Sequence, residues 1–315
     1  MRKTKLLSAA EKAIKYALKL KEGENFLLVT DKQKMEIAEA LAFWAKEVGA
    51  EVTTYLMTET LRPITKPTKL FENLIKSADV TLYLLEGRIE EKPFRGYMVK
   101  EGSTHGRICM MPGITREMME RLVNIDYFEL DKLGKKLIEI LTDAEEIIVE
   151  NRLGTKISFS VKGRKWENDN GDISQKGKHG NLPCGEIYTA PVEETFNGKL
   201  VISLIDDKMG LGIMEFKNGK LIKWSGKGIS EVVKAIGDDQ TGFIVGEFGI
   251  GTNRFAKICP NMLEAEKAWG TCHVAIGDSY GLGANKSKFH YDSLVEKVTI
   301  KVKDSYIVKD GKFLV

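Results

Sequence analysis

The chain has 315 residues, of which 43% are hydrophobic and 30% charged, and 48 basic side chains nearly balance 45 acidic ones. This length and composition suit one large or two ordinary globular domains, and they exclude a disordered, collagen-like or disulfide-rich chain. The formal net charge of +3 provides no long-range attraction to nucleic acid or to anionic membranes. With only four histidines and four cysteines, any metal or thiol chemistry depends on a few side chains.

The sequence offers no targeting or membrane signal. The N-terminal residues alternate apolar and charged side chains at helical spacing, which predicts an amphipathic helix rather than a signal peptide. No apolar stretch approaches the roughly twenty residues that a membrane-spanning helix needs. The cysteines are dispersed without a CxxC pair, as is typical of a reducing compartment. We therefore expect a cytoplasmic protein with neither a nucleic-acid nor a membrane partner.

Helical and strand patterns alternate in the first half of the chain. We expect helices at 8–21, 33–48 and 68–77, and strands at 25–30, 51–57, 80–85 and 107–111. This alternation predicts an α/β domain with a Rossmann-like parallel sheet. The first strand-to-helix turn contains Asp31-Lys32-Gln33 instead of a G-x-G-x-x-G fingerprint, so we expect a scaffold rather than a dinucleotide site.

The second half consists mainly of strands separated by Gly, Asn and Asp turns. Asn218-Gly219 and Asp310-Gly311 are hairpin signals, and one helix is expected near 261–269. These patterns predict an α+β C-terminal domain rich in antiparallel strands. We place the boundary after residue 142, which gives domains 1–142 and 143–315.

His290 and Asp292 are the first candidates for metal chemistry. If their segment is a strand, both side chains project from one face, because strand side chains alternate. An imidazole and a carboxylate facing one point form half a site for a divalent metal. A hydrogen-bonded surface pair is an equally good explanation of these two residues alone.

Four further residues stand in unusual settings. His273 lies in a segment rich in small residues, with Tyr280 seven positions later, and by itself it suits a buried core histidine. Glu247 follows an apolar run inside a glycine-rich turn, and Glu186 precedes a short strand. Taken singly, either glutamate is better explained as a solvated strand end.

Together, these segments resemble a known family. NLPCGEIYTAPVEETFNG, GEFGIGTN, GTCHVAIGDSYG and FHYD, in this order, resemble the M29 family of metallo-aminopeptidases, the leucyl aminopeptidase-like enzymes of the aminopeptidase T and aminopeptidase S type. The resemblance covers about residues 180–292. It implies a homodimer in which 1–142 is the scaffold and 143–315 is the catalytic domain that holds two divalent ions. Carried over position by position, the metal ligands are Glu186, Glu247, His273, Tyr280, His290 and Asp292.

The resemblance also implies an activity. Such an enzyme hydrolyses N-terminal residues from peptides with a water activated by two metals. The oxygen-rich ligands and two imidazoles favour zinc, cobalt or manganese over magnesium. We take Glu247 as the candidate bridging carboxylate, Glu186 as the catalytic proton relay, and Tyr280 as either a ligand or a catalytic group that stabilises the oxyanion.

Two alternatives stay open. Ring-cleaving dioxygenases of the dihydroxypyridine type also resemble this family, and their single ferrous iron would be held by His273, His290 and Asp292. Glu186 and Glu247 favour the peptidase, because a mononuclear iron site does not need them. The second alternative is a non-catalytic family member.

Overall fold

A computed structural model of the protein describes residues 4–315. These residues form two compact units, the first made of the chain up to Tyr127 together with Gly171–Cys184, and the second of Phe128–Asn170 with Gly185–Val315. No helix among the described residues is both long enough and apolar enough to span a bilayer. The assignment of a scaffold to 1–142 and of catalysis to 143–315 stays a prediction.

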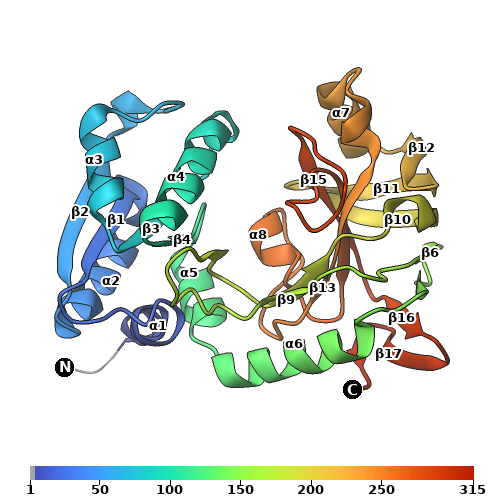
Figure 1. Ribbon diagram of the computed structural model, residues 1–315, viewed down its shortest axis with the longest axis horizontal. Helices are drawn as coiled ribbons and strands as arrows, with labels where there is room; N and C mark the ends of the chain where they lie inside the picture. Colours follow the sequence, from blue (N-terminus) through green and yellow to red (C-terminus); the bar gives the residue numbers. More distant parts are fainter. Residues whose placement is uncertain (1–3) are drawn as a thin grey trace. The chain divides into compact units, whose positions relative to one another are not determined.

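The first unit is built on a parallel sheet, which confirms the predicted α/β class (Figure 1). In the described part of the chain its five strands lie in the order β2-β1-β3-β4-β8. The strands are β1 (Asn25–Asp31), β2 (Glu51–Met57), β3 (Val80–Leu84), β4 (Arg107–Met110) and β8 (His179–Asn181). The helices are α1 (Lys5–Lys12, continued by a π-helical turn at Ala13–Ala17), α2 (Met35–Glu47), α3 (Lys69–Ser77), α4 (Lys92–His105) and α5 (Arg116–Met118).

The sequence pattern explains most of these elements. Every residue of β3 is buried, as expected of a parallel strand covered by helices on both faces. Helix α4 was not predicted, because Pro93, Gly96 and Gly102 interrupt its periodicity. Pro93 lies at the start of the helix, where a missing N–H group is tolerated.

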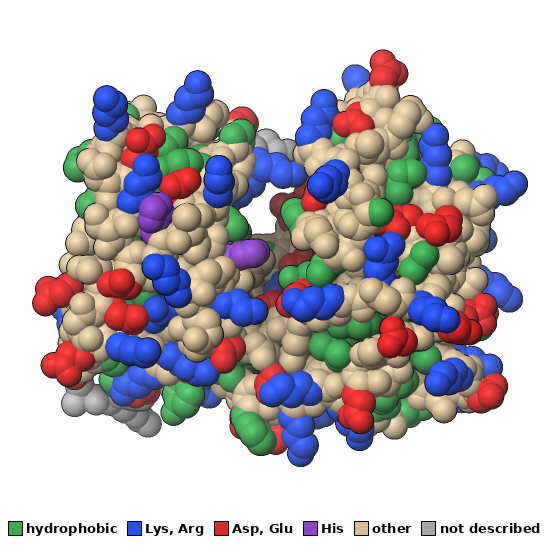
Figure 2. Space-filling view, viewed as in Figure 1, with side chains coloured by type: hydrophobic (Ala, Val, Ile, Leu, Met, Phe, Trp, Pro, Cys, Tyr) green, Lys and Arg blue, Asp and Glu red, His purple; other side chains and the backbone are tan. Residues whose placement is uncertain are grey.

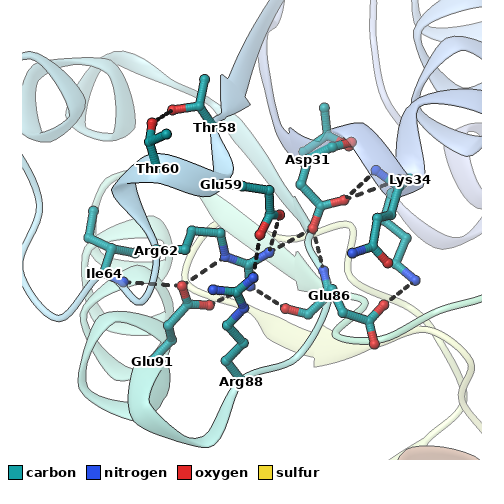
Figure 3. Close-up of polar contacts among 12 residues, drawn as sticks. Asp31, Lys34, Thr58, Glu59, Thr60, Arg62, Ile64, Glu86, Arg88 and Glu91 are labelled. Atoms are coloured by element: carbon teal, nitrogen blue, oxygen red, sulfur yellow. Dashed lines mark hydrogen bonds and ion pairs between the residues drawn. The ribbon is translucent and has the colours of Figure 1, made fainter.

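A buried ion-pair cluster lies at the carboxyl ends of β1 and β3 (Figure 3). Asp31 Oδ1 accepts hydrogen bonds from the backbone N–H groups of Gln33 and Lys34, which caps the following turn. Asp31 Oδ2 accepts from Arg62 Nη1 at 2.8 Å, and Arg62 Nη2 donates to Glu91 Oε2 at 2.6 Å. The turn that cradles phosphates in a dinucleotide-binding sheet is therefore filled by the chain's own charged side chains.

The second unit is built on a large antiparallel sheet, as predicted. Thirteen strands in the described residues form it, and its main path is β18-β17-β16-β5-β6-β10-β15-β14-β13-β9-β7, with β11 and β12 following β10. The strands are β5 (Ile147–Glu150), β6 (Lys156–Phe159), β7 (Glu167–Asp169), β9 (Glu186–Thr189), β10 (Asn197–Ile205), β11 (Lys208–Lys217), β12 (Lys220–Ser225), β13 (Val245–Gly251), β14 (Cys272–Gly277), β15 (His290–Val295), β16 (Thr299–Val302), β17 (Ser305–Lys309) and β18 (Lys312–Phe313). Its helices are α6 (Tyr127–Leu141), α7 (Lys227–Ile236) and α8 (Met262–Ala265).

Both predicted hairpins are present. Asn218 and Gly219, with φ of 49° and 78°, connect β11 to β12. Asp310 and Gly311, with φ of 48° and 76°, connect β17 to β18. Positive φ at both central residues is the turn geometry that Asn-Gly and Asp-Gly favour. The expected helix near 261–269 is shorter than predicted, and α6 and α7 were not predicted.

The surface carries charges of both signs. Figure 2 shows Lys and Arg side chains interspersed with Asp and Glu over the visible face. This distribution agrees with the near balance of acidic and basic residues in the sequence.

Candidate metal centre

Four adjacent strands of the antiparallel sheet, β9, β13, β14 and β15, bring five of the six predicted ligands together. Directly opposed residues in an antiparallel sheet share a face. Glu247 lies opposite Ala275, which lies opposite Asp292, so the two carboxylates flank a small side chain on one face. The members of this face are Glu186, Gly251, Tyr188, Gly249, His273, Leu294, Glu247, Ala275, Asp292, Gly277 and His290.

Glycine and alanine leave the space that the larger side chains need. Gly249 is paired with His273 on the neighbouring strand, and Gly277 is paired with His290. Glu247 therefore lies inside β13 and not in a glycine-rich turn as we expected. The glycines around it permit close approach of side chains across the strands, whereas in the sequence they suggest a turn.

The opposite face of these strands belongs to the hydrophobic core. Phe248, Ile250, Val274 and Ile276 are fully buried there. The alternation of core and ligand residues along each strand thus fixes which side chains face the site. It confirms that His290 and Asp292 share one face.

The imidazole nitrogens and carboxylate oxygens are close to one another. His273 Nε2 lies 3.1 Å from Glu247 Oε1 in hydrogen-bond geometry and 3.3 Å from Glu186 Oε2. His290 Nε2 lies 3.4 Å from Asp292 Oδ1 and 3.9 Å from Glu247 Oε2. Glu247 thus presents one oxygen to each histidine and links the two halves of the cluster.

His290 is oriented by the backbone. Its Nδ1 lies 2.8 Å from the carbonyl oxygen of Asp278, and because a carbonyl can only accept, Nδ1 carries the hydrogen. Nε2 is then the nitrogen presented to the carboxylates. A ring N–H bonded to a backbone carbonyl is a common support for a metal-ligating histidine.

Unsatisfied polar atoms show that this site fits a cation. Glu186 Oε2 and Asp292 Oδ1 are buried and have no hydrogen-bond partner in the described residues. A histidine nitrogen lies 3.3 or 3.4 Å from each of these oxygens without forming a hydrogen bond. Buried carboxylate oxygens without hydrogen bonds are costly, and a divalent cation would satisfy them. Ligand atoms of Glu247, His290 and Asp292 lie within 4.8 Å of one another. Carboxylates with imidazoles are a donor set for zinc, cobalt or manganese.

The carboxylates dominate the electrostatics of the site. Burial alone would lower the pKa of His273, but the hydrogen bond to Glu247 and the charge of Glu186 raise that pKa to about 10. Burial acts in the same way on His290, and Asp292 and Glu247 raise its pKa to about 9. Burial would raise the pKa of Asp292, but the two histidines lower it to about 2. This negative environment favours cations.

Tyr280 lies at the edge of the cluster. It has φ of 50°, the residue is 63% exposed, and its ring centroid lies 4.4 Å from that of His290. The structure therefore places the aromatic ring over one predicted ligand. The role of its hydroxyl as a ligand or an oxyanion donor stays a prediction.

Three charged residues at the site, Lys267, Glu266 and Asp169, were not predicted from the sequence. Lys267 is fully buried, and its Nζ contacts Glu186, Glu266 and Asp169. Burial raises the pKa of Glu266 to about 8, although the charge of Lys267 opposes that shift. In the sequence, Lys267 stands in a charged segment that suggests a solvated surface, so no local signal distinguishes it.

A buried set of carboxylates and imidazoles on one sheet face defines the ligand cluster of a metalloenzyme. The sequence matches the thermophilic metalloprotease (M29) family over residues 127–313, and the chain belongs to this family. This match confirms the resemblance found in the sequence, and it makes the protein a metal-dependent peptidase acting on peptide substrates.

Solved structures with the same fold span the whole chain. One is 2,5-dihydroxypyridine dioxygenase from Pseudomonas putida KT2440, with a TM-score of 0.77, 16% identity and coverage of 98% of this chain and 97% of that one. Another is wild-type AmpT from Thermus thermophilus, with a TM-score of 0.75, 16% identity and coverage of 99% of both chains. No match is found among curated proteins. At this identity, the likeness to both structures establishes the fold.

Proposed function

We propose that the protein is an aminopeptidase that holds two divalent ions, of zinc, cobalt or manganese, and removes N-terminal residues from peptides. The observation that carries the proposal is the position of Glu247, whose two oxygens face different histidines. A carboxylate placed in this way is suited to bridge two ions. Family membership supports peptide-bond hydrolysis, and the sequence motifs resembling M29 aminopeptidases support action at the N-terminus.

The proposed ligands are Glu186, Glu247, His273, His290 and Asp292, with Tyr280 at the edge. Divalent ions in such a site lower the pKa of water and polarise a carbonyl group. Glu186 Oε2 has no hydrogen-bond partner among the described residues, so this oxygen is available to ligate or to accept a proton. We assign to the exposed Tyr280 either ligation of a metal ion or donation of a hydrogen bond to a developing oxyanion.

Metal content and peptide cleavage test the proposal together. The purified protein is reconstituted with Zn²⁺, Co²⁺ or Mn²⁺, its metal content is measured, and release of leucine from an N-terminal leucyl peptide is followed. We expect two ions per chain and cleavage of the free peptide, with the N-acetylated peptide resistant. E247A and H273A are expected to lose both metal and activity, whereas H105A, which alters the last residue of α4, is expected to retain both.

The same measurements test the dioxygenase alternative. One iron per chain with oxygen uptake on a dihydroxypyridine, and no peptide cleavage, would favour a mononuclear site of His273, His290 and Asp292. Failure to bind any divalent ion or to act on either substrate class would favour a non-catalytic family member. The homodimer and the cytoplasmic location stay predictions, and light scattering of the purified protein tests the dimer.

A further inference from the structure

Lys267 is a buried cation beside the proposed ligands. Its side chain has 0% exposure. In the sequence the residue follows α8 and precedes β14. Burying an ammonium group is unfavourable unless it is paired and hydrogen-bonded. Its Nζ donates to Glu186 Oε1 at 3.0 Å and to Glu266, and it lies 4.0 Å from Asp169 Oδ2.

The sheet explains why a cation is needed there. Asp169 on β7 and Glu186 on β9 lie directly opposite each other, and like charges at such positions are destabilising. Lys267 contacts both carboxylates. The backbone fixes its position, because Asn253 N–H donates to the Lys267 carbonyl at 2.9 Å and Lys267 N–H donates to the Glu264 carbonyl at 3.1 Å.

The two oxygens of Glu186 have different surroundings. Oε1 accepts from Lys267, whereas Oε2 is buried without a hydrogen-bond partner in the described chain and lies 3.3 Å from His273 Nε2. A salt bridge to one oxygen restricts rotation of the carboxylate. The other oxygen then faces the histidine and the rest of the ligand cluster.

We propose that Lys267 is a positioning residue that engages one oxygen of Glu186 and directs the other into the metal centre. With Oε1 engaged by Lys267, Glu186 would bind a metal ion through Oε2 alone, as a monodentate ligand. This inference rests on the proposed function only in taking Glu186 as a metal ligand. Mutation of a group that supports a metal ligand in this way commonly lowers the affinity for the metal about 10- to 100-fold.

Cobalt binding to K267M provides the first test. Methionine has a similar length but no charge. We expect Co²⁺ affinity to fall about 10- to 100-fold and the absorption spectrum of bound Co²⁺ to change, because Glu186 is released. K199M, which removes an exposed lysine on β10 of the same sheet, is the matched control and is expected to bind Co²⁺ like the unaltered protein. Unchanged or tighter binding by K267M would overturn the proposal.

A double-mutant cycle separates positioning from a general structural role. If Lys267 acts through Glu186, K267M causes no further loss of Co²⁺ affinity in an E186Q background. An equal loss in both backgrounds would mean that Lys267 acts on the site by another route. If E186Q itself leaves Co²⁺ binding unchanged, Glu186 is not a ligand and the proposed metal site fails, whereas loss with E186Q but not with K267M rejects the role of Lys267 alone.

Circular dichroism establishes that each variant is folded. If K267M does not fold, the substitution is made together with E266Q, which removes one carboxylate left without its cation, and is compared with E266Q alone. Weaker Co²⁺ binding by the double variant supports the positioning role, and equal binding rejects it.

Discussion

Gly249 and His273 lie opposite each other on β13 and β14, and a Cβ atom at position 249 would be 2.0 Å from His273 Cε1. No real side chain tolerates such a contact, so the imidazole would have to move. For G249A we expect at least tenfold weaker Zn²⁺ binding, measured by calorimetry, and a destabilisation of about 1–3 kcal/mol from overpacking.

G96A is the control for this substitution. Gly96 is exposed inside α4, and an added Cβ would have nothing within 4 Å. We expect it to increase the free energy of unfolding by about 0.5–1 kcal/mol and to leave Zn²⁺ binding unchanged. If G249A and G96A bind Zn²⁺ with equal affinity, Gly249 is not needed to leave space for the His273 imidazole.

Zinc binding is expected to release protons. In the metal-free protein the pKa values of His273 and His290 are about 10 and 9, so both imidazoles are protonated near neutrality, whereas a metal ligand must be neutral. The apparent Zn²⁺ affinity should therefore rise with pH until these groups lose their protons. Calorimetry in buffers of different ionisation enthalpy measures the release, and binding at pH 7 without proton release would contradict the protonated state.

The same pKa values predict how the metal-free protein responds to alkali. Both folded-state pKa values are raised above the ordinary 6.5, so the stabilisation is fully present below that pH. It is lost as pH rises through about 9 and 10. H290A should show a smaller loss of unfolding free energy over this range, as measured by urea titration.

Arg62 is expected to stabilise the first unit. Its side chain and those of its partners Asp31 and Glu91 have 0% exposure, so R62A would leave two buried carboxylates without their cation. Breaking a buried pair in this way typically costs about 3–5 kcal/mol. Urea titration measures the change, and a loss below about 1 kcal/mol would be too small for a buried pair.

Acid should act on the same cluster. Burial would raise the pKa of Glu91, but the hydrogen bond from Arg62 lowers it below 4.5. Its stabilising contribution is present above the ordinary pKa and is lost as pH falls through the lowered one. As pH falls below 4.5, the unfolding free energy of E91Q should therefore decrease less steeply than that of the unaltered protein.

Metal removal should lower the stability of the second unit. A ligand that binds only the folded state at 100 times its dissociation constant contributes about 2.7 kcal/mol. The W44F variant retains only Trp166, Trp224 and Trp269, all in the second unit, so its fluorescence follows that unit. We expect a chelator to lower the unfolding temperature seen by this probe, and an unchanged temperature would contradict a stabilising metal.

The period of two along strands was enough to place His290 beside Asp292. It was not enough to place Glu247, because the glycines around it have the composition of a turn. Their actual role depends on His273, which belongs to another strand and is paired with Gly249. Such cross-strand proximity is absent from local sequence.

Lys267 illustrates the same limit more strongly. Two of the carboxylates it contacts are brought together by the pairing of β7 with β9, which sets Asp169 opposite Glu186. No local pattern around residues 266 and 267 encodes that pairing. The family motifs supplied the proposed ligands, whereas the cation that contacts one of them required the three-dimensional structure.

The edge strand β8 has a consequence for synthesis of the chain. The other four strands of the parallel sheet end by Met110, but β8 is His179–Asn181 and lies between β7 and β9 in sequence. During translation, the parallel sheet therefore cannot be completed until α6 and strands β5 to β7 have left the ribosome. Neither unit is one continuous stretch of chain, so the simple order in which an N-terminal domain folds before the next begins does not apply to this protein.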